Sequence, residues 1–378
     1  LVVAAGLLLR TFTALGSRPL GFDADRTLVV NIDAQRVPAD TVPRLLLYDR
    51  VRAAAGQVPG VAGAAYSLVT PMQGGGISDQ VEVSGGAKLP PALLGGIANV
   101  YGNMVSTGWF TALGVRVIAG RDFTADDRTG APRAAIVNEA FVRTFLGGAD
   151  PIGRTLKHLR GVQAQIVGVV ADSVYGSLRE PAPPTFYEPL PQADLPPISL
   201  SNVSLTVRAG DRPAAIARSV TAAIEQVSSD VALTVFPLSD QVNAALAQER
   251  VTALLASTFG AVALALAGLG VYGVTAYAVA RRRAELGIRL ALGATPAAVV
   301  RLVLSHVALI VAIGVIAGAA ASAWAARFIA SLLYGLPPRD PATFIGAVAT
   351  LAAVSTVAAF MPAWRASRIE PAEVLREN

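Results

Sequence analysis

Two long stretches of this chain carry no charged residue. They are Val251–Ala280 and Leu302–Ala326, and the second has His306 as its one polar ionisable side chain. A helix needs about 20 consecutive apolar residues to cross a bilayer, and both stretches exceed that length. The sequence therefore predicts a membrane protein, with spans at about 251–280 and 297–323.

Two further apolar segments predict two more spans. Pro341–Trp364 lies between Asp340 and Arg365 without any charge, and Leu1 to about Leu15 is apolar apart from Arg10. The first segment lacks the basic start and the small-residue cleavage site of a signal peptide. We interpret it as the outer end of a truncated first transmembrane helix.

Arginines near the ends of the spans predict the orientation. The link between spans two and three contains Arg281, Arg282, Arg283, Arg289 and Arg301, and the segment after span four contains Arg365, Arg368 and Arg376. The link between spans three and four has only Arg339. Loops rich in Lys and Arg remain in the cytoplasm. We therefore expect residues 17–245 to form an extracytoplasmic domain, between the end of the first helix (1–16) and a membrane domain (246–378).

The large insert has a mixed α/β pattern. Alternating or continuous apolar runs predict strands at 27–33, 61–70, 81–84, 97–106, 134–137, 165–171, 186–189, 200–208 and 231–237. Helical spacing predicts helices at 43–57, 108–113, 138–146 and 212–228, and a further helix that starts near Ser239 and continues into span two. Asn138 is suited to cap its helix. The fold class is thus a four-span α-helical membrane protein with a large α/β insert.

Composition excludes several kinds of chemistry. The chain has no cysteine and two histidines, His158 and His306, which excludes a thiolate metal site and a cysteine nucleophile and leaves little for a metal cluster. No G-x-S-x-G or H-E-x-x-H motif occurs, and we expect no metal site, no cofactor and no catalytic residues. Its Arg residues alternate with Asp and Glu through the insert, which does not favour a nucleic-acid partner. No G-x-x-x-x-G-K-[ST] phosphate loop occurs, so P-loop binding of ATP is excluded for these residues.

Glycines inside the spans predict close helix packing. Gly268, Gly270 and Gly273 match G-x-G-x-x-G, but they lie within a span and not after a strand, which argues against a dinucleotide site. Gly314 and Gly318 fit the small-x-x-x-small motif of membrane helix contacts, within the chain or with another chain.

The segment between spans two and three has features of its own. Arg281–Leu292 predicts a short helix at the membrane surface, with apolar contacts from Leu286, Ile288, Leu290, Ala291 and Leu292. Arg282, Glu285 and Arg289 fall on one polar face, with an i,i+4 ion pair between the last two. Gly293 suits the C-terminal cap and Pro296 prevents continuation. Physical chemistry alone leaves two alternatives, an orienting cytoplasmic loop or a helix that docks onto another protein.

This segment resembles the FtsX/MacB-type ABC transporter permease family. Residues 283–294 are similar to its R-x-E-[IL]-G-I-R-x-A-[LI]-G-A signature, and residues 362–376 resemble its closing segment. In the insert, 105–114, 120–123 and 136–140 resemble the MacB-type periplasmic core, and 332–341 is also similar to the family. The chain would then be one permease, or the C-terminal half of a duplicated permease with two four-span halves.

The resemblance implies a multi-pass protein of the bacterial inner membrane that is not itself an enzyme. A cytoplasmic ABC ATPase would be its partner, through a coupling helix formed by Arg281, Arg282, Arg283, Glu285, Leu286, Gly287, Ile288, Arg289, Ala291, Leu292 and Gly293. It also implies a permease dimer or a second permease half, membrane lipids, and a periplasmic adaptor or outer-membrane channel as partners.

Three functions stay open at this point. The first is mechanical transmission for efflux or for lipoprotein or peptide handling, and the second is non-transporting regulation of cell-wall hydrolases. The third is an ion-driven secondary transporter. It is disfavoured because spans two to four contain no Asp, Glu or Lys, which ion-coupled carriers usually keep at membrane depth.

Overall fold

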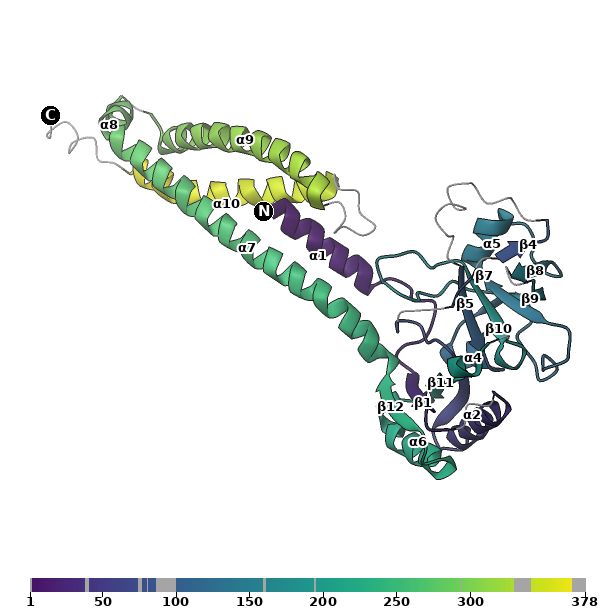
Figure 1. Ribbon diagram of the computed structural model, residues 1–378. Helices are drawn as coiled ribbons and strands as arrows, with labels where there is room; N and C mark the ends of the chain where they lie inside the picture. The colour runs from purple at the N-terminus through teal and green to yellow at the C-terminus, as the bar shows by residue number, and fades with distance from the viewer. Residues whose placement is uncertain are drawn as a thin grey trace. The chain divides into compact units, whose positions relative to one another are not determined.

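The computed structural model shows two compact units (Figure 1). It describes residues 2–37, 41–73, 77–79, 81–85, 100–158, 161–193, 195–292, 294–329 and 341–368. Residues Leu1–Ser17 and Leu246–Asn378 make up a helical unit, and residues Arg18–Ala245 make up an α/β unit.

The first part of the α/β unit has a ferredoxin-like topology. The strands lie in the order β12-β1-β11-β2, all antiparallel, with bounds Thr27–Asp33 (β1), Val61–Ser67 (β2), Asn202–Ala209 (β11) and Ala232–Pro237 (β12). Helix α2 (Thr41–Gly56) connects β1 to β2, and α6 (Pro213–Val227) connects β11 to β12. Two β-α-β units are thus interleaved in one sheet, and the chain between β2 and β11 forms an insertion.

The insertion extends the same sheet. It continues in the order β5-β10-β7-β9-β8-β4, with bounds Val100–Val105, Thr185–Pro189, Ala134–Asn138, Gln163–Val170, Thr155–His158 and Val81–Val83. The pairs β5/β10 and β7/β9 are parallel. Strand β3 (Ile77–Asp79) pairs with β5, and β6 (Val117–Gly120) pairs with β9. Helices α4 (Trp109–Leu113) and α5 (Glu139–Leu146) and the 3-10 turns η1 (Leu190–Gln192) and η2 (Pro197–Leu200) complete the insertion.

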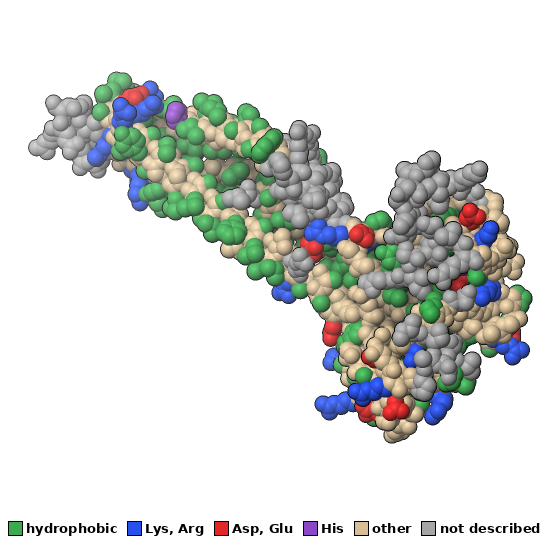
Figure 2. Space-filling view, viewed as in Figure 1, with side chains coloured by type: hydrophobic (Ala, Val, Ile, Leu, Met, Phe, Trp, Pro, Cys, Tyr) green, Lys and Arg blue, Asp and Glu red, His purple; other side chains and the backbone are tan. Residues whose placement is uncertain are grey.

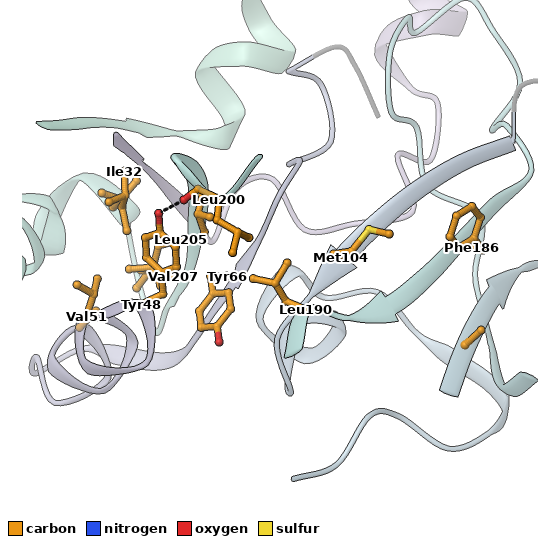
Figure 3. Close-up of a cluster of buried hydrophobic side chains, with 14 of the residues drawn as sticks. Ile32, Tyr48, Val51, Tyr66, Met104, Phe186, Leu190, Leu200, Leu205 and Val207 are labelled. Atoms are coloured by element: carbon orange, nitrogen blue, oxygen red, sulfur yellow. Dashed lines mark hydrogen bonds between the residues drawn. The ribbon is translucent and has the colours of Figure 1, made fainter. Parts of the chain in front are cut away.

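Separate apolar cores hold this unit together. The larger core packs α2 and α6 against the sheet. In Figure 3, Tyr48 of α2 points towards Leu200, and the Tyr48 hydroxyl donates a hydrogen bond to the Leu200 carbonyl. A second core is aromatic, with Trp109 and Phe110 of α4 against Tyr187 of β10. Burial of these large side chains is the main favourable contribution to folding.

The helical unit contains the membrane-span candidates. Helix α7 (Leu238–Arg281), α9 (Pro296–Ile329) and α10 (Pro341–Ala366) are, within the described residues, long and apolar enough to cross a membrane. Helix α1 (Val2–Gly16) is a shorter apolar helix, and α8 (Arg283–Ala291) is the short helix between α7 and α9.

Small residues allow the helices of this unit to approach closely. A Cβ atom added at Gly260 of α7 would lie 3.1 Å from Ala5 of α1, and one added at Gly268 would lie 3.2 Å from Val354 of α10. Arg10 of α1 donates a hydrogen bond to the Thr343 hydroxyl of α10 at 3.3 Å. Close backbone approach at small residues is a usual source of helix association in membranes.

The predicted fold class is confirmed, with differences in the details. Span two is part of a longer helix that begins at Leu238, close to the expected Ser239. The short helix expected over 281–292 is present as α8, which begins at Arg283, because Arg281 is instead the last residue of α7. Strands β3, β6 and β8 were not predicted, since each has only three or four residues.

Candidate functional site

Helix α8 is held by a small apolar cluster at one end of the helical unit. Leu286 of α8, Val299 of α9 and Ala366 of α10 are buried, with 3%, 2% and 1% of their surfaces exposed. Val279 of α7 and Leu290 of α8 pack against them. This cluster therefore joins α8 to the ends of the three span candidates.

The opposite face of α8 is exposed. Ile288 is 48% exposed and Leu292, directly after the helix, is 83% exposed. Both side chains therefore lie outside the apolar cluster, because 3.6 residues per turn place them away from Leu286. Gly287 is buried, as Leu286 is, so one side of α8 is packed against the helical unit. Among the described residues, no helix or strand covers the apolar side at Ile288 and Leu292.

The predicted ion pair on α8 is present. The Arg289 guanidinium donates to the Glu285 carboxylate at 2.7 Å, one turn apart, and both side chains are about half exposed. A pair this exposed adds well under 1 kcal/mol to stability. The two charged groups lie near Ile288 and give the exposed face a polar border.

Positive charge gathers at this end of the helical unit (Figure 2). Arg281, Arg282 and Arg283 are all exposed, and Glu285 is the only carboxylate among the described residues from 281 onwards. The Arg365 guanidinium lies 3.5 Å from the Tyr272 hydroxyl. Of the other predicted site residues, Gly293 and the side chain of Ala291 lie outside the described residues.

The span glycines fall into different environments. Gly268 faces Val354 closely, whereas a Cβ atom at Gly270 or Gly273 would meet nothing within 4 Å. Gly314 and Gly318 also have open space, and they line a groove of about 300 Å³ with residues of α1, α7 and α10.

A larger groove beside α8 contains residues that were not predicted as a site. It has a volume of about 780 Å³ and lies between the start of α9 and the end of α10. Arg301 lines it from α9, and Trp364 and Arg368 line it from the α10 side, with the Arg368 guanidinium 4.0 Å above the Trp364 ring. The spacing of Trp364 and Arg368 beside a span end is the signal that could have indicated it.

Polar networks in the α/β unit serve its structure. The Asn138 side chain accepts hydrogen bonds from the amides of Phe141 and Thr185 and donates to the Pro183 carbonyl, so the predicted cap of α5 is confirmed. His158 and Glu188 form a buried pair at 2.7 Å. Within the described residues, no group of three His, Asp or Glu side chains is placed to hold a metal ion.

One turn of this unit has shifted carboxyl groups. The Arg121 guanidinium donates to both oxygens of Asp127, at 2.7 and 2.9 Å, and holds the pKa of that carboxyl below its usual value. Burial raises the pKa of the nearby Asp122 carboxyl. The opposite directions follow from an ion pair at one position and loss of solvent at the other.

Two family models match the chain. The model of the MacB-like periplasmic core domain matches residues 1–223, and the model of the FtsX-like permease C-terminal region matches residues 257–371. Together they account for both the α/β unit and the spans after it.

Similar proteins carry related names. The chain is 32% identical over 129 residues to the macrolide export ATP-binding/permease protein MacB of Nitrobacter winogradskyi, covering 34% of this chain and 20% of that relative. It is 24% identical over 282 residues to the ABC transporter permease YknZ of Bacillus subtilis, covering 72% of this chain and 69% of YknZ. The chain thus spans about a fifth of the length of the first relative and about two thirds of the second.

A solved structure is also similar. The periplasmic region of MacB from Actinobacillus actinomycetemcomitans aligns with 60% of this chain and 94% of its own, at 12% identity and a TM-score of 0.39. The assignment rests on the two family models, which match in the order expected from the sequence. The chain belongs to the MacB/FtsX family of ABC transporter permeases.

Proposed function

We propose that this permease transmits the work of a partner ATPase to its extracytoplasmic domain. ATP hydrolysis would occur on a cytoplasmic ABC ATPase, and the permease would convert the movement of that protein into movement of residues 18–245. The exposed face of α8, formed by Ile288, Leu292 and the Glu285–Arg289 pair, is the proposed docking surface.

The observation that carries this proposal is the two-sided environment of α8. Leu286 ties the helix to α9 and α10, while Ile288 and Leu292 expose apolar surface next to an ordered ion pair. A helix that only linked two spans would have no need of both features. Apolar anchors bordered by charges are typical of protein interfaces.

The distribution of arginines supports the orientation. Arg281, Arg282, Arg283 and Arg289 are exposed around α8, as expected for a segment that stays in the cytoplasm. We therefore propose a multi-pass protein of the inner membrane, with spans at α7, α9 and α10 and with its α/β unit on the extracytoplasmic side.

We propose that the movement serves efflux, or the handling of lipoproteins or peptides at the outer face. MacB is named for macrolide export, and the names of similar proteins provide the support for this part. A second permease copy, or a second permease half, would pack against the faces that leave Gly270 and Gly273 open. A periplasmic adaptor or outer-membrane channel would complete the export route.

The absence of cysteine from the chain permits a direct test of the docking surface. Leu292→Cys, in the full-length protein expressed in its host, would be labelled with a photoreactive maleimide, and crosslinked proteins would be identified by mass spectrometry. Ile118→Cys is a matched control, because Ile118 is an exposed apolar residue of the α/β unit, outside the span candidates.

We expect Leu292→Cys to crosslink to a protein that carries an ATP-binding phosphate loop, and Ile118→Cys not to do so. The docking proposal is wrong if an ATPase purifies with the permease but crosslinks from neither position. Capture of a cell-wall hydrolase through the extracytoplasmic domain, without any ATPase, would instead favour the regulatory function.

A further inference from the structure

The groove between α9 and α10 has an apolar floor and a cationic rim. Its floor is formed by Leu304 and Ala308 of α9 and by Phe360 of α10, and Arg301 and Arg368 lie at one end. Arg301 and Ala308 are about 10 Å apart along α9, given 1.5 Å per helical residue. The groove therefore changes from charged to apolar over the distance between a lipid headgroup and the start of its acyl chains.

Arg301 and Arg368 can form ion pairs with an anionic ligand. Among the residues that the structure describes, neither forms an ion pair with a carboxylate, and Glu285, the one carboxylate in this part, already binds Arg289. The Arg368 guanidinium lies on the Trp364 ring, which orders it without neutralising it. An anion in the groove could thus contact the guanidinium groups of Arg301 and Arg368, which both line it.

Trp364 indicates the depth at which the anion would bind. Tryptophan prefers the interface between headgroups and hydrocarbon, and Trp364 lies at the end of the α10 span. The arginines flank that level, while Phe360 lies one turn further into the span. A soluble anion would use only the rim, whereas an amphiphile would fill the whole groove.

We propose that this groove binds an anionic phospholipid of the cytoplasmic leaflet. The phosphate lies between Arg301 and Arg368, and an acyl chain follows the surface formed by Leu304, Ala308 and Phe360. The inference rests on the proposed orientation of the spans but not on the proposed ATPase docking. Because the groove adjoins the ends of α9 and α10, the lipid would stabilise the helices that hold α8.

The test measures retained lipid directly. The full-length protein would be reconstituted into vesicles of equal parts phosphatidylglycerol and phosphatidylcholine, extracted in a neutral detergent, and analysed by native mass spectrometry. The test variant is Arg301→Gln with Arg368→Gln. The charge-matched control is Arg281→Gln with Arg282→Gln, which removes two exposed arginines that do not line the groove.

We expect the wild type and the control to retain phosphatidylglycerol in preference to phosphatidylcholine. The test variant should lose about tenfold of that preference, since each arginine near anionic lipid contributes substantially to binding. Ala308→Trp, which fills the apolar floor and keeps both arginines, should also reduce retention. Circular dichroism and elution volume would establish that each variant is folded.

Three results would overturn the proposal. One is equal loss of phosphatidylglycerol in the test and control variants, which would indicate general attraction to charge. Another is displacement of the retained lipid by millimolar inorganic phosphate, which would identify a site for a free anion. The third is loss of dimers in the test variant with unchanged lipid, which would assign the groove to a second copy. ATPase crosslinking from Leu292→Cys is a separate readout, so either proposal can fail alone.

Discussion

Leu286 of α8 and Val299 of α9 are buried in one cluster, with 3% and 2% of their surfaces exposed. Ala366 at the end of α10 completes the cluster. Cores transmit displacement because they are close-packed, so α8 cannot move far without α9 and α10. This contact is the structural basis for assigning α8 a role in coupling.

Alanine substitutions of the buried Leu286 and the exposed Leu292 should distinguish residues that stabilise the fold from residues that bind a partner. Leu286→Ala removes buried apolar surface and should lower the free energy of unfolding by about 2 kcal/mol. Leu292→Ala changes an exposed side chain and should leave stability within about 0.5 kcal/mol of the wild type. Thermal unfolding of the detergent-purified protein measures both, and equal melting temperatures would contradict the buried cluster.

The glycines of α7 should tolerate side chains differently. Gly268→Leu would drive atoms into Val354, from which even a Cβ would be only 3.2 Å away, and should separate α7 from α10. Gly270→Leu enters open space and should be neutral or stabilising in the isolated protein, because leucine favours helices more than glycine does. Melting temperatures in detergent test this pair. A dimer that is lost only in Gly270→Leu would support packing of that face against a second copy.

Asn138 should contribute several hydrogen bonds to the α/β unit. Asn138→Ala leaves the amides of Phe141 and Thr185 and the Pro183 carbonyl without this partner, and should cost about 2–4 kcal/mol. Asn138→Asp keeps the accepting oxygen and loses the donation to Pro183, so its cost should be smaller. The melting transition of the α/β unit, followed by near-ultraviolet circular dichroism, checks the order; an equal cost for both variants would count against the cap.

The turn at Asp127 should make stability depend on acid pH. Because Arg121 lowers the pKa of Asp127 in the folded protein, the ionised carboxylate stabilises the fold above pH 4, and that contribution is lost as the pH falls further. The stability of Asp127→Asn should therefore fall less than that of the wild type between pH 5 and pH 3. At neutral pH the variant should be less stable than the wild type by about 1 kcal/mol.

Asp126→Asn is the control for this turn, because Asp126 is the exposed neighbour with the same charge. The raised pKa of Asp122 acts in the opposite direction. Burial is its largest cause and the charge of Asp127 its smallest, so most of this contribution is common to all three proteins. Urea midpoints measured at pH 3, 4, 5 and 7 would suffice. An unchanged pH dependence in Asp127→Asn would show that the Arg121 pair does not act as described.

Local features of this structure could be predicted from the sequence because they depend on neighbouring residues. The Glu285–Arg289 pair follows from i,i+4 spacing, the Asn138 cap follows from a strand-to-helix change, and the spans follow from uninterrupted apolar runs. In each case one segment contains all the residues that decide the outcome.

Relationships between distant segments could not be predicted in this way. The pairing of β1 with both β11 and β12 depends on residues about 170 or more positions away, and apolar alternation does not specify a partner. Similarly, Leu286 and Ile288 look alike in sequence, and only the position of α9 decides that the first is buried. The groove at Arg301 and Arg368 requires both α9 and α10 and was missed for the same reason.

The proposed function requires that the exposed face of α8 receives the motion of an ATPase. The most direct measurement is the ATP hydrolysis rate of the purified partner ATPase reconstituted in vesicles with the permease, comparing wild type with the double variant Ile288→Asp, Leu292→Asp. Both side chains are exposed, so the variant should fold, and placing two carboxylates on an apolar docking face should reduce stimulation by about tenfold or more. Full stimulation in this variant, with the complex intact, would show that the exposed face of α8 does not couple the two proteins.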